Sequence, residues 1–237
     1  MSEQQRFGSY TIGLKDFIDL LLIGPIFTIL TFLLMRRIIT DYSRYTESKD
    51  RIQGLYVAYL IAIVLFNYGT IIHVTMNRLN SQITGDLRSE GVYDAIYFLD
   101  EVIGHLFLTL GFFLILYEAA YLHMLTIKHR SEAKDLEGFM LGEGEKRINL
   151  FYGIALGVIT TVAYLEGQCA FIFLILYPIF TVLFIIMAKK QGVSLQENSF
   201  LVMILLMTIF FTISTVLYAF ITGIKPVYPF FYQPSEL

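Results

Sequence analysis

Long, nearly uncharged apolar segments constrain this chain more than any other feature. Six of them follow one another, over residues 17–35, 55–76, 96–125, 149–165, 170–188 and 200–224. A helix that crosses the hydrocarbon core of a bilayer needs about 20 mostly apolar residues. We therefore predict an all-α, polytopic integral membrane helix bundle. It forms a single domain over residues 1–237, with six transmembrane helices, or seven at most.

The composition excludes several other classes of protein. Apolar residues make up 56% of the chain and charged residues only 16%, whereas a soluble domain carries about 25% charged residues. The 17 Lys and Arg are outnumbered by 20 Asp and Glu, so there is no positive excess of the kind that binds nucleic acid. A single cysteine, Cys169, excludes an internal disulfide and a Cys-rich metal site. We expect the lipid bilayer, and no nucleic acid, as the partner.

The basic residues predict the orientation of the helices. The loops after the first, third and fifth apolar segments contain 12 of the 17 Lys and Arg. Loops rich in these residues stay in the cytoplasm. This rule puts both termini on the extracytoplasmic side of a cell membrane. The first apolar segment follows a polar stretch without the basic region of a signal peptide, so we expect it to be a retained span.

Ionisable side chains inside the apolar segments are the main functional signal, because burying one in a bilayer costs a few kcal/mol. They are Asp19, His73, Asp100, Glu101, His105, Glu118 and His123. With the predicted orientation, the first five lie in the extracytoplasmic half of the membrane. Glu118 and His123 lie in the inner half of the third segment. We interpret them as interface residues, with a proton relay as the alternative.

Helical spacing groups three polar residues of the second segment. Thr70, His73 and Asn77 are spaced i, i+3 and i+7, which places them on one face of a helix. We predict His73 as a metal ligand, because imidazole is a common ligand of transition metals. Thr70 and Asn77 are predicted to contact the substrate, with hydrogen bonding to the metal ligands as the alternative.

The third segment supplies the remaining candidate ligands. Glu101 and His105 are four residues apart and share a helical face. Together with His73 they form a ligand set suited to a divalent transition metal: zinc, or iron or manganese. Asp100 is rotated about 100° from Glu101 on a regular helix, so it joins the site only if the helix is unwound there. We predict Asp100 as a further ligand, and Asp100 or Glu101 as the catalytic base. A water-filled polar cavity without metal is the alternative.

Two more segments carry structural expectations. A continuous helix from residue 92 to residue 127 would be about 50 Å long, so we expect it to tilt, protrude, or bend near Gly104 or Gly111. Residues 225–237 combine prolines with aromatic residues. We expect these aromatics at the outer membrane interface, with a lid over an outward-facing cavity as the alternative.

A short pair of motifs resembles a known family. The stretch Gly69-Thr-Ile-Ile-His73-Val-Thr75, followed by Leu99-Asp-Glu101, resembles the alkaline ceramidases. Their superfamily of seven-span, metal-dependent membrane hydrolases includes the adiponectin receptors. The resemblance implies zinc, hydrolysis of a lipid amide or ester, and His73 and Asp100 as ligands. Gly69 occupies the position of the family's serine. The family's final-span histidine pair has no counterpart, and His105 would take its place.

Four functions are compatible with these residues. Our leading prediction is a metal-dependent membrane hydrolase acting on a lipid-like amide or ester. The second is an ion or proton transporter or channel that uses the same acidic and histidine residues. The third is a haem carrier with His73 and His105 as axial ligands. The fourth is a non-catalytic membrane subunit that assembles into a homo- or hetero-oligomer.

Overall fold

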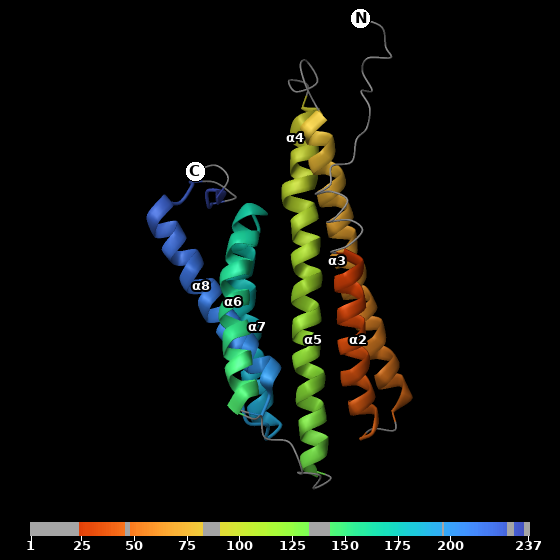
Figure 1. Ribbon diagram of the computed structural model, residues 1–237. Helices are drawn as coiled ribbons and strands as arrows, with labels where there is room; N and C mark the ends of the chain where they lie inside the picture. Colours follow the sequence, from red (N-terminus) through yellow and green to blue (C-terminus); the bar gives the residue numbers. More distant parts are fainter. Residues whose placement is uncertain are drawn as a thin grey trace, which may run out of the picture.

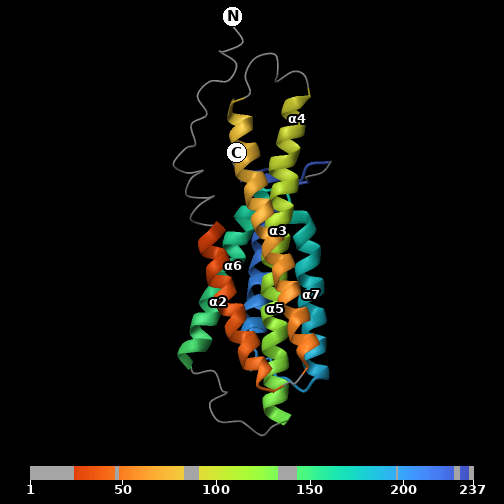
Figure 2. The same cartoon turned by 90° about the vertical axis from the view of Figure 1, so that its right-hand side faces the viewer.

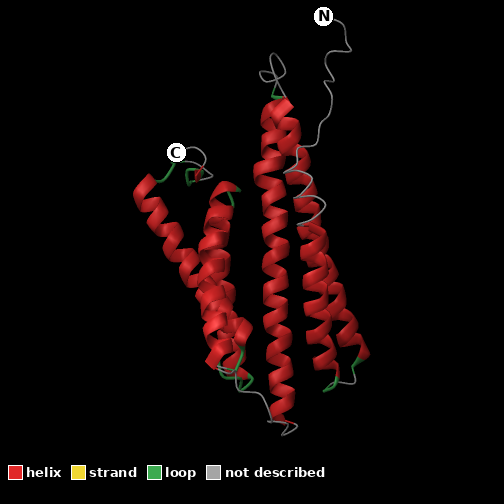
Figure 3. Ribbon diagram, in the orientation of Figure 1, coloured by secondary structure: helices red, strands yellow, loops and turns green. Residues whose placement is uncertain are grey.

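The computed structural model describes residues 24–45, 48–82, 91–132, 143–195, 197–226 and 230–234 (Figure 1). Its helices are α2 (Gly24–Ser43), α3 (Lys49–Gln82), α4 (Val92–Tyr97), the π-helix η4 (Phe98–Gly104), α5 (His105–Glu132), α6 (Glu143–Glu166), α7 (Ala170–Lys190) and α8 (Ser199–Thr222). Every one of these elements is helical (Figure 3), which confirms the predicted all-α class.

Within the part of the chain that the structure describes, five helical stretches are long and apolar enough to cross a membrane: 49–80, 92–132, 147–166, 170–190 and 199–222. They coincide with the second to sixth predicted segments, and most extend past the apolar part into polar sequence. The predicted segment 17–35 is described only from Gly24, where α2 begins. The multi-pass helical character is therefore confirmed. The count of six spans and the side of the termini stay predictions.

A single long helix organises the fold. α4, η4 and α5 run on from one another as one rod in the middle of the molecule (Figure 1). α2 and α3 pack on one side of this rod, and α6, α7 and α8 pack on the other. Two buried apolar clusters hold these halves together, and α5 contributes side chains to both. The rod therefore packs against both halves and contributes to the core of each.

Connections alternate between the two ends of the molecule, as spanning helices require. The C-terminal ends of α2, α5 and α7 lie at one end of the molecule. The α6–α7 turn lies at the other end, together with the C-terminal segment (Figures 1 and 2). α6 and α7 are joined by a short turn at Gly167, Gln168 and Cys169. In it, the Cys169 amide donates to the Tyr164 carbonyl at 3.0 Å. The described helix ends that flank the basic loops therefore lie at one end of the molecule.

Glycines let α3 approach the central rod at backbone distance. A Cβ atom on Gly104 would lie 3.0 Å from the backbone nitrogen of His73. A Cβ on Gly69 would lie 2.6 Å from the Gly104 carbonyl oxygen, and it would also collide with the backbone of Leu108. Small residues of this kind allow helices to pack closely in membranes. The contact brings His73 directly against η4.

Candidate metal centre

The π-helix turns Asp100 toward α3. Hydrogen bonds in a π-helix join residues five apart, so residues at this spacing lie near one face, and such segments often occur at functional sites. Asp100 and His105 are five apart, at the start of η4 and just beyond its end. Asp100 is only 1% exposed and points into the contact with α3. Because η4 is a π-helix, the rotation of about 100° between Asp100 and Glu101 that a regular α-helix would give does not apply there.

Three side chains from α3, η4 and α5 converge at this contact. His73 Nδ1 lies 2.7 Å from Asp100 Oδ1, and the rings of His73 and His105 are 4.2 Å apart between centroids. The potential ligand atoms of the three residues all lie within 4.8 Å of one another. A single cation could contact all three. We call His73, Asp100 and His105 the metal-capable group.

Hydrogen bonds orient both imidazole rings. His105 Nδ1 lies 3.2 Å from the Asp100 backbone carbonyl, which accepts, so this nitrogen donates and Nε2 is left for a ligand. A histidine that ligates a metal through one nitrogen and donates from the other is the usual arrangement. His73 Nδ1 faces the Asp100 carboxylate. A cation held by both His73 and Asp100 would take the place of the proton between these two groups, because Nε2 of His73 points away from the carboxylate.

One oxygen of the Asp100 carboxylate bears on whether a cation fits the group. Asp100 Oδ2 is buried and has no hydrogen-bond partner among the described residues. Leaving a buried charged acceptor unsatisfied costs more than the ~1–3 kcal/mol of a neutral group. A divalent cation beside Oδ2 would remove this cost. Two imidazoles and one carboxylate also form a common ligand set of catalytic zinc sites. The group therefore fits a divalent transition metal.

Glu101 lies beside the metal-capable group and is not one of its three members. Its Oε2 atom is 3.8 Å from His105 Nδ1 and accepts a hydrogen bond of 3.2 Å from Gln233 Nε2. The shared face predicted for Glu101 and His105 therefore brings them close, while Asp100 supplies the carboxylate between the two rings. The roles of Glu101 as ligand or base stay predictions.

The two predicted substrate contacts lie along α3 on either side of His73. Thr70 is buried and donates its hydroxyl proton to the Phe66 carbonyl at 2.9 Å. Asn77 lies one turn beyond His73 and is half-buried. Neither residue belongs to the metal-capable group, and their contacts with a substrate stay predictions.

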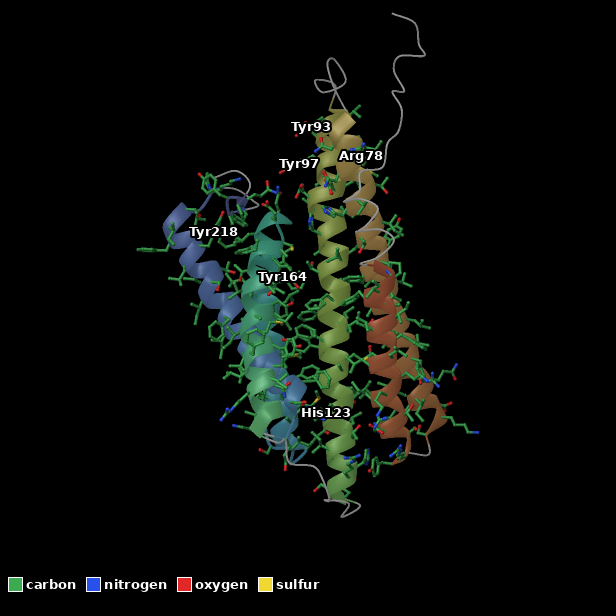
Figure 4. All side chains as sticks on the ribbon, in the orientation of Figure 1. Arg78, Tyr93, Tyr97, His123, Tyr164 and Tyr218 are labelled. Atoms are coloured by element: carbon green, nitrogen blue, oxygen red, sulfur yellow. The ribbon has the colours of Figure 1, made fainter. Side chains whose placement is uncertain are left out.

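Four hydrogen bonds that the sequence did not suggest surround Glu101. They join the side chains of Gln233 and Gln168 to Tyr97, Glu101 and Glu166, and we call them the clasp. Gln233 Nε2 donates to the Glu166 carbonyl at 2.6 Å as well as to Glu101, and Gln233 Oε1 accepts from the Tyr97 hydroxyl at 3.0 Å. Gln168 Nε2 donates to the Tyr97 oxygen at 2.6 Å. Tyr97 projects from the upper part of the central rod (Figure 4). The clasp ties the C-terminal segment and the α6–α7 turn to Tyr97 and Glu101, beside the metal-capable group.

Gly167 is a second residue that sequence reasoning missed. A Cβ atom at this position would lie 2.5 Å from Cγ of His105. The backbone of the α6–α7 turn therefore packs on the His105 ring, and only glycine leaves room for it. The available signal was a glycine inside a very short link between two apolar segments.

The other ionisable residues lie apart from this centre. His123 Nδ1 lies 3.2 Å from Asn198 Oδ1. The Asn198 side chain also caps the first turn of α8 by accepting a hydrogen bond from the Leu201 amide. The role of His123 as an interface residue stays a prediction. Glu118 lines a separate apolar cavity. Asp19 lies outside the described residues.

Comparison with known proteins found no matching family model, no matching curated protein and no matching solved structure. The resemblance to the alkaline ceramidases is therefore untested by any relative.

Proposed function

We propose that this chain is a metal-dependent membrane hydrolase that acts on a lipid-like amide or ester. The observation that supports the proposal is the metal-capable group, with its buried and unpartnered Asp100 Oδ2. His73, Asp100 and His105 would hold a divalent ion, for which we propose zinc. When bound, such an ion supplies Lewis acidity toward water and toward a carbonyl group.

The protein side chains would position the reactants around this centre. Asp100 and His73 would hold the cation together, because Oδ1 and Nδ1 are only 2.7 Å apart. Glu101 lies beside His105 and carries a second carboxylate oxygen that can accept a proton from an attacking water, which is the role of a general base. Gln233 holds Glu101 through a hydrogen bond to Oε2. Asp100 would thus hold the cation, and Glu101 would move the proton.

Apolar surface next to the group supports a lipid-like substrate. Phe98 and Leu99 precede Asp100 and are 52% and 37% exposed, and Tyr68 and Ile71 on α3 are about half exposed. A substrate could reach the group sideways from the bilayer along these side chains. By the positive-inside rule, we propose that the group lies in the extracytoplasmic half of a cell membrane.

Metal analysis of the purified protein tests the proposal. We expect one transition-metal ion per chain in the wild type and less than a tenth of that in His73→Ala and in His105→Ala. His129→Ala is the matched control, because His129 lies near the other end of α5 and contacts Glu132. We expect this variant to keep its metal. Equal metal content in all four proteins would refute the site.

Hydrolysis then tests the reaction. The probes are a long-chain fatty-acid 4-nitrophenyl ester and an N-acyl lipid amide, presented in mixed micelles. We expect turnover by the wild type with zinc, and a loss of at least 100-fold in His73→Ala. A metal-loaded wild type that hydrolyses neither probe would contradict the proposed reaction.

A further inference from the structure

An apolar cavity of about 470 Å³ lies between α3, α5 and α7, away from the metal-capable group. Its lining consists of Leu55, Ala58, Ile61, Phe113, Leu114, Tyr117, Glu118, Tyr121, Phe180 and Phe184. Ligand pockets are typically of this size, with apolar and aromatic walls and a few polar groups that orient the ligand. Glu118 is the charged residue among these ten.

Glu118 has no partner that would explain its place in the bundle. Its Oε1 atom is buried without a hydrogen bond, and no hydrogen bond or ion pair joins Glu118 to another described residue. The Tyr117 hydroxyl next to it is already bonded to Thr181 at 2.7 Å and to the Tyr177 carbonyl. Ionisable residues at membrane depth normally pair with another group. The structure therefore holds a carboxyl group with an unused hydrogen-bonding capacity.

The cavity opens toward the lipid side of the bundle. Ile61 on its α3 wall is 55% exposed, and Ala58 one turn earlier is also exposed. These residues belong to one of the helices long enough to span a membrane. A ligand dissolved in the bilayer could enter between α3 and α7 without crossing water.

The cavity and the metal-capable group are separate sites. Glu118 follows His105 by 13 residues on the same helix α5, a distance of about 20 Å at 1.5 Å per residue. None of the ten lining residues belongs to the metal-capable group or to the clasp around Gln233. A ligand here would act independently of the proposed hydrolysis.

We propose that this cavity binds a single-chain amphiphile that carries an ammonium group, with the ammonium on Glu118 and the hydrocarbon chain against the aromatic wall. We infer a positively charged head group because the unpartnered group in the cavity is the carboxyl group of Glu118. A hydrogen bond between an ammonium donor and a carboxylate is among the strongest in proteins, and it would neutralise both groups in a medium of low polarity. The chain would contact Phe180 and Phe184 on α7.

Photolabelling in phosphatidylcholine nanodiscs tests this inference. The probes are hexadecylamine and hexadecanol, each with a diazirine near the end of the chain, and the labelled peptides are located by mass spectrometry. We expect the amine to label the cavity of the wild type at least tenfold more than the alcohol does. Glu118→Gln should reduce amine labelling to the level of the alcohol. Glu132→Gln, on the exposed end of the same helix, should label like the wild type.

A second variant keeps the test decisive if Glu118→Gln does not fold. Ala58→Phe places a ring in the mouth of the cavity, and we expect it to lose labelling by both probes. Equal labelling of the wild type by amine and alcohol would indicate a neutral lipid and overturn the proposal. No labelling of the cavity by either probe would indicate that a protein helix covers it, which also overturns the proposal. Metal content plays no part in these outcomes.

Discussion

Replacing Gly167 with alanine tests the link between the α6–α7 turn and the metal-capable group. The added methyl carbon would lie 2.5 Å from Cγ and 2.6 Å from Cδ2 of the His105 ring. Ordinary van der Waals contact begins near 3.4 Å, so the ring or the turn must move by about 1 Å. Overpacking of this kind costs about 1–3 kcal/mol. Displacing a ligand through a neighbouring residue typically lowers metal affinity about 10–100-fold.

Gly54→Ala is the matched control for this substitution. Gly54 lies in the first turns of α3 with nothing within 4 Å of its added Cβ atom. Alanine is favoured over glycine in a helix by roughly 0.5–1 kcal/mol. The same chemical change is therefore expected to stabilise the protein slightly at Gly54 and to destabilise it at Gly167.

The assay combines zinc affinity with unfolding. Zinc affinity is measured by competition with a fluorescent chelator, and stability by the unfolding midpoint in detergent with and without zinc. We expect Gly167→Ala to bind zinc at least tenfold more weakly and to gain less stability from zinc than the wild type does. Zinc affinity equal to that of the wild type, together with an unchanged midpoint, would show that the turn does not press on His105.

Three further substitutions follow from the same geometry. Asp100→Asn keeps the shape of the side chain and removes its charge, so we expect metal affinity, measured by the same competition, to fall by more than about 100-fold; an affinity within tenfold of wild type would contradict this. Gln233→Leu removes three hydrogen bonds of the clasp, worth about 1.5–4.5 kcal/mol in total at ~0.5–1.5 kcal/mol each. Faster hydrogen exchange in the C-terminal segment would report this, with Gln53→Leu on exposed α3 as the unaffected control. Gly69→Ser introduces the serine that the alkaline ceramidases carry in the similar motif, but it puts a Cβ against the backbone of Leu108. We therefore expect a loss of folded, metal-binding protein in size-exclusion chromatography; a well-folded variant would refute the close packing.

The positions of the helices could be predicted from the sequence because their cause is local. A run of about 20 apolar residues has few stable conformations in a bilayer other than a helix. The polar extensions of α3 and α6 were missed, because hydrophobicity reports where a helix crosses lipid and not where its backbone hydrogen bonds end. The continuation of α2 past Arg36 and Arg37 was missed for the same reason.

The candidate site was predictable in its residues and only partly in its geometry. His73 and His105 stand out because ionisable groups in apolar segments are rare. The relation of Asp100 to Glu101 was not predictable, since spacing arguments assume a regular α-helix and η4 is wound differently. Gln233 lies 132 residues from Glu101. No local pattern indicates such a contact, because it arises only when the C-terminal segment packs on the finished bundle.

The length of the central rod also sets the depth of the metal-capable group. Lys128 near one end of α5 and Asp100 in η4 are 28 residues apart, which corresponds to about 42 Å along a straight helix. The hydrocarbon core is only ~30 Å thick, and ~40–45 Å with both headgroup layers. With Lys128 at the outer edge of one headgroup layer, Asp100 falls within the opposite headgroup layer. His105 is about 35 Å from Lys128 along the helix, which places it near the boundary between that layer and the hydrocarbon core. That layer is where bilayer lipids carry the ester and amide bonds joining their chains to their polar heads, so a lipid could present such a bond without leaving the membrane.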